Sequence, residues 1–521
     1  MIEVEVHKSL RNILRSRTEP SWPHHLTMAR LVARALRLGR SALIQTATYP
    51  CSREQRYELS YLMPLLMWEG PTILVAPATV QERLLRVDIP QLLEQNPDGS
   101  SIFPHKPIQT YPPTSEIKGL LLIAPQDWLA DRLQGRQLPP GIPTVIDWAD
   151  DLETLAREQL TVRLQQRDWN ELIELYPAKA ETIRQWRVEL TRSLFQHPPN
   201  PYGCYLISPP EQQILKQLIE TLNSLEDPGQ RSQGNSPRQR VNSHQRRRNF
   251  WHQWSQEKQL RWAEIDRLQG SFTLYCAPLD LAPILAPIWS QQPVVLIGAA
   301  LELEAKAPIY RMNLGLGELT CVKFSSDRLG GIIKLYLPRR LPMPNTPQFQ
   351  PALLSQLRTL LSMSNFAAPG ITVILVEDVP LKQRVGAILA SEFGSRVRVE
   401  KTALDENGIL VTGWKFWRDH QPLLGPPLLL IIATLPLPSL ENPLVAGRVA
   451  DYKQRGLDWF RLYLLPDALR EVQRATATVR QSQGVVALLD SRVIHRSYGH
   501  QVLAALSPYA RIDYLDTTWL T

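Results

Sequence analysis

The chain has 521 residues, 44% of them hydrophobic and 21% charged, which is an ordinary globular composition and enough length for two or three domains. Its formal charge of +8 and isoelectric point of about 9.3 favour an anionic partner such as nucleic acid, although a charged surface without such a partner fits the composition equally well. The 4 cysteines are scattered and form no Cys-x-x-Cys pair. We therefore expect reduced thiols and no zinc knuckle. The N-terminus is charged and no apolar run can span a bilayer, which predicts a cytoplasmic protein without membrane association.

Short apolar runs alternate with helical patterns along most of the chain. Runs of this kind are typical of strands covered on both faces, as in a parallel sheet. They lie at residues 72–76, 120–124, 144–147, 294–298, 371–377, 428–433 and 485–490. Helical stripes are expected over residues 28–38 and 466–480. The alternation predicts an α/β fold with ligands at the carboxyl ends of the strands.

The middle of the chain has a different pattern. From residue 152 to about 195 the apolar residues recur at helical spacing. Residues 226–249 then contain almost no apolar side chain and are rich in arginine, glutamine, serine and asparagine, which predicts a flexible basic loop. The sequence thus predicts a mostly helical insertion with a basic loop.

The C-terminal segment carries an ordered set of motifs. "LPLPSLENPLVAGR" precedes "YLLPDALREVQRATATVRQSQGVVALLDSRVIHRSYGHQVLAAL". This order resembles the second motor domain of the DinG/XPD-type superfamily-two DNA helicases. The positions in step with that family are Gln473, Arg480, Gly484, Asp490, Arg492, Tyr498 and Gly499.

The N-terminal half is in step with the same family. "YLMPLLMWEGPTILVAPATVQERLL" resembles the helix and strand after its phosphate loop, and "GLLLIAPQDWLADRL" with "TVIDWADDLETLA" resembles the approach to its Asp-Glu-Ala-His box. "GSFTLYCAPLDLAPILAPIWSQQPVVLIGAALEL" resembles the return to the first motor domain and its Ser-Ala-Thr motif. The resemblance implies two RecA-like parallel-sheet motor domains, the first carrying the insertion. The boundaries expected are 1–151 and 263–344 for the first motor domain, 152–262 for the insertion and 345–521 for the second.

The phosphate loop of the family has no counterpart here. Such a loop needs glycines for close backbone approach to phosphates, a lysine, and a hydroxyl for magnesium. Gln45, Thr46 and Thr48 enter the loop as relics of a nucleotide site, but between Thr48 and Pro64 there is neither glycine nor lysine. We expect no working phosphate loop.

The Asp-Glu-Ala-His box is altered as well. Asp147 matches the metal-facing aspartate, whereas Trp148 replaces the glutamate that would orient water and Asp150 replaces the histidine. A helix-capping role is the alternative for both aspartates, and we favour it over metal binding. The Ser-Ala-Thr motif reads Gly298-Ala299-Ala300. His25 stands near the position of the family's adenine-reading glutamine, but we favour a surface or capping role for it.

The C-terminal motif has lost its first arginine. Ala477 stands at that position, Arg474 and Thr476 replace glycines, and Arg480 remains at the second arginine position. Loss of an arginine finger lowers the rate by roughly a thousandfold or more. The sequence therefore predicts a helicase-like fold that has lost ATP hydrolysis. Because the family hydrolyses ATP, an active enzyme is the alternative.

The expected sites follow from these substitutions. No catalytic residue is assigned; the relic positions are Asp147, Asp150, Gln473 and Arg480. No cofactor or metal is assigned, and ATP with magnesium would bind only if the chain were active. Residues 65–143 contain no cysteine, so the iron–sulfur cluster of many relatives is not expected.

A nucleic-acid interface is expected in the insertion. Arg246, Arg247 and Arg248, followed by Trp251 and Trp254, combine cations for phosphates with aromatic rings for bases. A solvated loop is the alternative. The resemblance implies single-stranded or forked DNA as partner, together with a protein partner in DNA repair or replication.

Three hypotheses stay open. The first is an ATPase-deficient helicase-fold protein that binds nucleic acid, the second an active ATP-dependent DNA helicase with unorthodox motifs, and the third a protein-interaction scaffold.

Overall fold

The computed structural model describes residues 2–16, 21–47, 49, 56–94, 106–113, 116–135, 138–223, 249–325, 331–364 and 370–513. The chain divides into two compact units. Unit 1 comprises residues 1–152, 282–437 and 460–521, and unit 2 comprises residues 153–281 and 438–459.

Unit 1 contains two parallel sheets. The first has seven strands in the order β11-β1-β10-β5-β2-β4-β3, and all its pairings are parallel. Its strands are β1 (Ala42–Gln45), β2 (Thr72–Val75), β3 (Ile108–Thr110), β4 (Leu120–Ile123), β5 (Thr144–Ile146), β10 (Val294–Gly298) and β11 (Thr320–Lys323). The inner strands β1, β2, β4, β5 and β10 are buried along their whole length. This burial explains why their sequences are continuously apolar rather than alternating.

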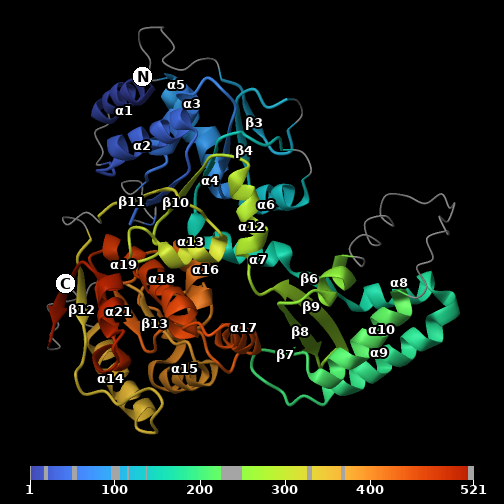
Figure 1. The fold of residues 1–521 in the computed structure, drawn as a ribbon. Helices are drawn as coiled ribbons and strands as arrows, with labels where there is room; N and C mark the ends of the chain where they lie inside the picture. The colour runs from blue at the N-terminus through green and yellow to red at the C-terminus, as the bar shows by residue number, and fades with distance from the viewer. Residues whose placement is uncertain are drawn as a thin grey trace. The chain divides into compact units, whose positions relative to one another are not determined.

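Helices flank this sheet (Figure 1). They are α1 (Ile2–Ser16), α2 (His25–Leu38), α3 (Leu59–Met67), α4 (Ala78–Arg83), α5 (Ile89–Glu94), α6 (Pro125–Gln134), α12 (Ala282–Ser290) and α13 (Pro308–Leu314). Helix α2 ends because Gly39 adopts a left-handed conformation with φ of 58°, and its N–H bonds the last carbonyls of the helix. The buried faces of α1, α2 and α3 pack together with strand residues such as Ile44 and Leu74 in one hydrophobic core.

The second sheet of unit 1 also has seven strands and parallel pairings, in the order β14-β15-β13-β16-β17-β12-β18. Its strands are β12 (Ile333–Tyr336), β13 (Thr372–Leu375), β14 (Val397–Val399), β15 (Ile409–Thr412), β16 (Leu429–Ile432), β17 (Val485–Leu488) and β18 (Tyr509–Ile512). Two parallel α/β sheets confirm the predicted fold class.

The helices of the second sheet include the C-terminal motif. They are α14 (Phe349–Ser364), α15 (Val379–Phe393), α16 (Trp414–Leu424), α18 (Leu465–Ala475), α19 (Ala477–Gln481), α20 (Arg492–His495) and α21 (Gly499–Leu506). Asp378 caps α15 by accepting the N–H of Leu381 at 2.6 Å. Gly499 opens α21 where an added Cβ would lie 1.8 Å from the carbonyl oxygen of Val493, so this close approach requires glycine.

Unit 2 is a separate α+β module. A four-stranded sheet in the order β6-β9-β8-β7 is antiparallel throughout. Its strands are β6 (Val162–Leu164), β7 (Cys204–Leu206), β8 (Gln259–Asp266) and β9 (Ser271–Pro278). Its helices include α7 (Leu152–Leu160), α8 (Gln166–Leu175), α9 (Ala180–Phe195), α10 (Pro209–Asn223) and α17 (Pro443–Gln454).

The sheet of unit 2 was not expected from the sequence. Residues 271–278, which the sequence analysis assigned to the return to the first motor domain, form β9 and pair with β8 in a long hairpin. In β9, buried Phe272, Leu274 and Cys276 alternate with half-buried residues, the period of a strand with one covered face. The predicted basic loop over residues 226–249 lies outside the described residues except for Asn249. The domain boundaries stay predictions. Among the described helices, none has the length and apolar character needed to cross a membrane.

Candidate functional site

The carboxylate of Asp147 lies at the carboxyl end of β5 and is enclosed by two tyrosines. Tyr57 donates its hydroxyl to Oδ1 and Tyr61 donates to Oδ2, each at 2.9 Å. The main-chain N–H of Trp148 also donates to Oδ1 at 2.9 Å. Asp147 is 1% exposed and both tyrosines are buried. Tyr61 lies on α3 and Tyr57 just before it, so the segment that follows the altered phosphate loop closes over the aspartate.

The electrostatics of this carboxyl group do not suit a metal ligand. Burial raises the pKa of Asp147 to about 7, and the negative charge of Glu58 adds to the rise, while the hydrogen bonds from the tyrosines oppose it. Burial also raises the pKa of Tyr57 and Tyr61 well above the ordinary value, so both phenols remain donors. Magnesium needs ionised oxygen ligands and retains several waters. Because Tyr57 and Tyr61 occupy both oxygens of this buried carboxyl group, the residues around Asp147 do not fit a magnesium–nucleotide complex.

Trp148 turns the chain away from the strand. It adopts a left-handed conformation with φ of 61° and ψ of 39°, which is uncommon for a bulky residue and costs roughly 1–3 kcal/mol. A short 3-10 helix (Ala149–Asp151) follows and leads into α7. The indole thus occupies the position of the family's glutamate without offering a carboxylate to the strand end.

Asp150 holds the loop that follows β10. Its Oδ2 accepts the N–H of Ala299 at 2.8 Å and its Oδ1 accepts the N–H of Ala300 at 2.9 Å. The hydroxyl of Tyr49 donates to Oδ1 at 3.4 Å. An added Cβ at Gly298 would lie 2.9 Å from Asp150 Oδ2 and 2.4 Å from a methyl group of Leu301, so a serine does not fit there. Asp150 caps main-chain donors, although those of a distant loop rather than of its own helix.

The expected relics of the nucleotide loop also bind main chain. The side-chain amide of Gln45 donates to the carbonyls of Glu304 at 2.8 Å and Ala305 at 3.3 Å and accepts the N–H of Glu302 at 3.1 Å. Thr46 donates its hydroxyl to the carbonyl of Gly298 at 3.4 Å. Gln45 and Thr46 are both 0% exposed. Thr48 lies outside the described residues.

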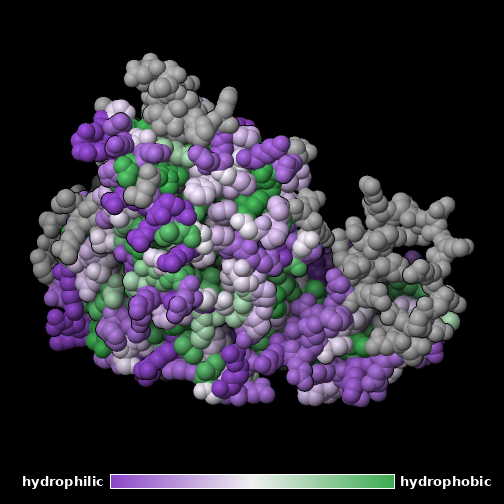
Figure 2. Space-filling model, turned by 45° about the horizontal axis from the view of Figure 1, so that its top comes forward, coloured by the Kyte–Doolittle hydropathy of each residue, from purple (hydrophilic) through white to green (hydrophobic). Residues whose placement is uncertain are grey.

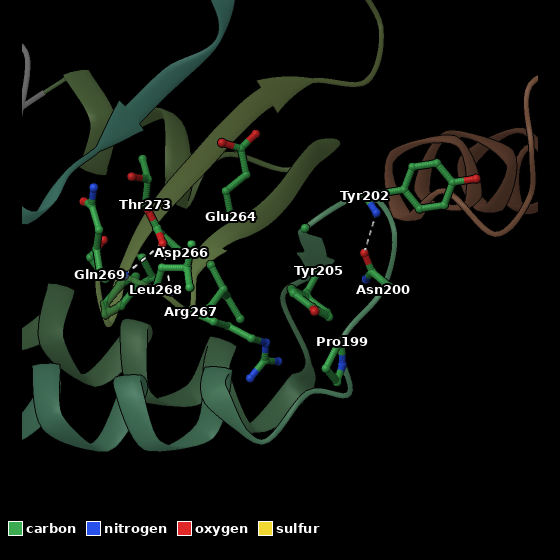
Figure 3. A pocket seen from close by; sticks show the side chains of 14 residues that line it. Pro199, Asn200, Tyr202, Tyr205, Glu264, Asp266, Arg267, Leu268, Gln269 and Thr273 are labelled. Atoms are coloured by element: carbon green, nitrogen blue, oxygen red, sulfur yellow. Dashed lines mark hydrogen bonds between the residues drawn. The ribbon is translucent and has the colours of Figure 1, made fainter. Parts of the chain in front are cut away.

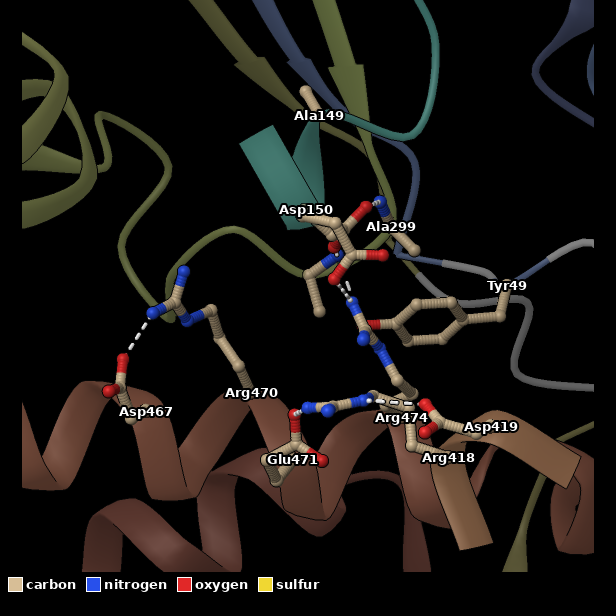
Figure 4. Close-up of polar contacts among 12 residues, drawn as sticks. Tyr49, Ala149, Asp150, Ala299, Arg418, Asp419, Asp467, Arg470, Glu471 and Arg474 are labelled. Carbon is tan, nitrogen blue, oxygen red and sulfur yellow. Dashed lines mark hydrogen bonds and ion pairs between the residues drawn. The ribbon is translucent and has the colours of Figure 1, made fainter. Parts of the chain in front are cut away.

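Arg474 connects the two sheets of unit 1 (Figure 4). Its guanidinium donates to Asp151 Oδ1 at 2.8 Å and its Cζ lies 5.7 Å from the ring centroid of Tyr49. Burial opposes its charge, but Tyr49 and the carboxylates of Asp151 and Asp150 raise its pKa above the ordinary value. Nearby, Arg418 donates to Glu471 at 2.8 Å. An arginine at a glycine position of the motif thus pairs with the residue next to the altered box.

Arg480 has a different setting from the one that the family motif implies. Its guanidinium donates to the carbonyls of Gly331, Leu506, Ser507 and Pro508 at 2.5–3.2 Å. Burial lowers its pKa to about 10. Arg480 therefore joins the approach to β12 to the end of α21, and it is not brought together with Asp147 or Asp150. Gln473 is half-buried on α18, one residue before Arg474.

The remaining expected positions are placed as follows. His25 is buried, and its Nδ1 lies 2.7 Å from the hydroxyl of Ser60. Trp254 is 3% exposed, and its ring packs 5.3 Å from that of Phe250 in the core of unit 2. Trp251 is half-buried and meets Phe250 edge-on at 4.9 Å. Arg246, Arg247 and Arg248 lie outside the described residues, so their role stays a prediction.

Sequence reasoning missed the tyrosines. Tyr57 and Tyr61 are four residues apart, which places them on one face of the helical turn leading into α3. That spacing next to a phosphate loop without glycine was the available signal. Within the described part of the chain, no group of three or more histidine, cysteine, aspartate or glutamate side chains could hold a metal ion.

Unit 2 carries an open pocket of about 660 Å³ beside the tip of the β8–β9 hairpin (Figure 3). Its walls include Tyr202, Tyr205, Glu264 and Arg267. Arg267 donates to the carbonyls of Phe195 and His197, and Glu264 accepts the hydroxyl of Tyr275, so these charges already have partners.

Comparisons with known proteins identify helicases that are similar to this chain in sequence. No family model matches the chain. It is 25% identical over 252 residues to the ATP-dependent DNA helicase YoaA of Escherichia coli, covering 46% of this chain and 40% of that protein. The YoaA of Haemophilus influenzae is 25% identical over 145 residues, covering 27% of this chain and 23% of that protein. The chain is related to the DinG/XPD-like helicases. The matches thus span less than half of these curated relatives.

The solved structures agree on the fold. S. tokodaii Xpd4 is 12% identical with a TM-score of 0.58, over 94% of this chain and 99% of that one. A structure described as XPD helicase is 12% identical with a TM-score of 0.59, over 95% of this chain and 100% of that one. The chain has the two-sheet XPD helicase fold.

Proposed function

We propose that this chain binds single-stranded or forked nucleic acid on a helicase fold and does not hydrolyse ATP. The observation that carries the second part is the enclosure of Asp147, whose two oxygens accept hydroxyls from Tyr57 and Tyr61 at 2.9 Å. Catalysis of phosphoryl transfer depends on positioned metal and water at this strand end. A buried carboxyl whose two oxygens both accept phenol hydroxyls offers neither.

The altered C-terminal motif supports the same conclusion. Ala477 replaces the arginine that would approach the nucleotide, and Arg480 is committed to carbonyls at the end of α21. Arg474 is committed to Asp151. Arg474 and Arg480 thus both have protein partners in place of a phosphate.

Binding of nucleic acid is supported by charge and by kinship. The chain carries a formal charge of +8, and its curated relatives are named DNA helicases. The arginines at 246–248 sit in a stretch from Pro228 to Gln256 that contains no acidic residue. Such a segment neutralises phosphates without reading base sequence.

The test uses the purified full chain with ATP, magnesium and labelled single-stranded or forked DNA. We expect salt-sensitive binding by fluorescence anisotropy and no DNA-stimulated phosphate release. Release above the level of a protein-free control would support the active helicase instead. Lack of binding to either DNA at low salt, with no turnover, would support the interaction scaffold.

A further inference from the structure

Hydrophobic residues on the face of the molecule shown in Figure 2 occur in small groups among hydrophilic ones. A docking site on such a surface is a local groove with specific chemistry rather than a broad apolar patch. One groove of this kind lies in unit 1, between α2 and the outer strand β11.

β11 is the end strand of the first sheet, and half of its main-chain groups face outward. It pairs on one side with β1, through the N–H groups of Thr320 and Phe324 bonding to Ser41 and Gln45. Because alternate residues of a strand point their N–H and C=O groups to opposite sides, those of Cys321 and Lys323 face away from β1. No other strand of the described residues pairs with them.

The other outer strands of the two parallel sheets are guarded. β3 is bracketed by Pro107 and by Pro112, and β18 follows Pro508 and carries exposed Arg511. β14 has only three residues and carries the half-buried Arg398. Prolines, charged residues and short edge strands of this kind protect sheet edges against pairing with another chain.

β11 has neither form of protection. It contains no proline, and its one cation, Lys323, turns inward to donate to the carbonyls of Glu302 and Leu303 at 2.8 Å. Burial accordingly lowers the pKa of Lys323. Within the described part of the chain, the outer edge of β11 is therefore open to a further strand.

The groove beside this edge is apolar at its base and basic at its rim. It has a cavity volume of about 150 Å³, on the order of a single large side chain, and its base includes Leu31, Ile44 and Val322. Arg34 and Arg40 line the rim, and both are exposed. Among the described residues, no carboxylate lies within ion-pair distance of Arg34 or Arg40.

The surroundings extend this positive charge. From Pro20 to Arg53 the sequence contains no acidic residue, whereas α2 and its C-terminal turn carry Arg30, Arg34, Arg37 and Arg40. Of these, Arg37 is paired with Glu3 at 2.6 Å. Leu38 adds a 39% exposed apolar side chain at the groove.

From these features we infer that the groove between α2 and β11 docks an extended acidic segment of a partner protein, which adds a strand to β11. The partner's main chain bonds the outward groups of Cys321 and Lys323. One of its leucine-sized side chains enters the groove, and its carboxylates meet Arg34 and Arg40. Main-chain pairing supplies affinity in this mode and the side-chain pocket supplies specificity. Docking at this groove does not depend on whether the chain binds or hydrolyses ATP.

The test uses the full chain and a labelled synthetic peptide in which aspartate alternates with leucine and valine. We expect binding by anisotropy, and the Arg34→Glu/Arg40→Glu variant should weaken it by at least about tenfold. The charge-matched control is Arg184→Glu/Arg192→Glu, on exposed positions of α9 in unit 2, which should bind as the unchanged protein does. Equal affinity of both double variants, or no binding of the peptide, would overturn the inference.

A second pair of variants isolates the main-chain contribution. Cys321→Pro removes an outward N–H, whereas Cys321→Ala keeps it, so only the proline variant should lose peptide binding by about tenfold. Circular dichroism establishes that both variants are folded. Single-stranded DNA competing for the site with the same dependence on Arg34 and Arg40, and with no effect of Cys321→Pro, would assign the groove to nucleic acid and refute the peptide.

Discussion

Arg474 and Asp151 form an ion pair at 2.8 Å between residues 323 positions apart in the sequence. Asp151 is the last residue of the 3-10 helix that follows β5, next to the altered box, and Arg474 stands where the family motif has glycine. The guanidinium is nearly buried, with 11% of the side chain exposed, whereas 39% of the Asp151 side chain is exposed. With the ring of Tyr49 5.7 Å from the guanidinium, the pair joins the segment after β5 to helix α18.

Removing the side chain of Arg474 should destabilise unit 1. Arg474→Ala is expected to lower the free energy of unfolding by roughly 1–3 kcal/mol, because it leaves Asp151 and Asp150 without a cation while the exposure of Asp151 limits the loss. Urea unfolding measures it. Arg418→Ala, which breaks a nearby pair with Glu471, is the matched control. A double-mutant cycle with Asp151→Asn that shows no coupling energy would contradict the contact.

Asp147→Asn should flatten the dependence of stability on pH. The folded-state pKa of Asp147 is raised to about 7, so the folded protein retains a proton that the unfolded chain has released. Stability from this group therefore falls as the pH rises from about 4 to 7, by on the order of 4 kcal/mol at most, and is level above that range. An asparagine keeps a neutral acceptor and should be more stable than aspartate at pH 8. Melting temperatures from pH 5 to 8 test this, and a parallel fall in both proteins would count against it.

Asp147→Ala should behave differently from asparagine. It leaves the hydroxyls of Tyr57 and Tyr61 buried without this acceptor, at a cost of about 1–3 kcal/mol for each unsatisfied group. This cost is structural and does not require Asp147 to take part in catalysis. Phosphate release should be the same in both variants and in the unchanged chain. Lower turnover in Asp147→Ala alone would indicate catalysis.

Arg480→Ala should lower the stability of the fold and leave nucleotide binding unchanged. The side chain donates to carbonyls at residues 331 and 506–508, and its loss leaves these acceptors without a cation. We expect destabilisation of roughly 2–4 kcal/mol and faster amide hydrogen exchange in β12 and β18. Arg480→Lys should recover only part of the stability, since one ammonium cannot reproduce the planar fork. Unchanged exchange in β12 and β18 would show that this role is wrong.

The basic segment yields a prediction for binding. Changing Arg246, Arg247 and Arg248 together to alanine should weaken binding to single-stranded DNA and lower the slope of log affinity against log salt by about 2, at roughly 0.7 for each phosphate contact. Fluorescence anisotropy at several salt concentrations measures the slope. The control is Arg184→Ala/Arg192→Ala in α9. The same slope in both variants would remove the segment from the interface.

Much of the fold was readable from the chain because the core strands are short and fully covered. The apolar runs at 72–76, 120–124 and 428–433 correspond to β2, β4 and β16. The hairpin of unit 2 was missed because its apolar alternation is incomplete. Tyr275 and Pro278 interrupt it in β9, and Trp262 in β8 fits a helical pattern equally well. Tertiary pairing, not local propensity, decides that stretch.

Only part of the candidate site could be predicted from the sequence. The sequence identified the losses, such as the lysine of the phosphate loop and the glutamate replaced by Trp148. It did not identify what fills the space, because the Tyr57–Asp147 contact joins residues 90 positions apart and depends on how α3 packs against β5. A lost motif is visible in one stretch of sequence, but its replacement is a property of the three-dimensional core.

The packing of Tyr57 determines how the proposed loss of ATP hydrolysis could be reversed. Its ring lies 5.9 Å from that of Trp22 and 6.4 Å from that of Tyr61, within the core that also holds α1 and α2. Reinstating glycines and a lysine between residues 48 and 57 would not free Asp147, because the hydroxyls that occupy it belong to side chains on which the core depends. Replacing Tyr57 and Tyr61 with smaller residues would open cavities, at a cost of several kcal/mol each by analogy with other large buried aromatics. Under the proposed function, regaining ATP hydrolysis would therefore require substitutions that destabilise unit 1.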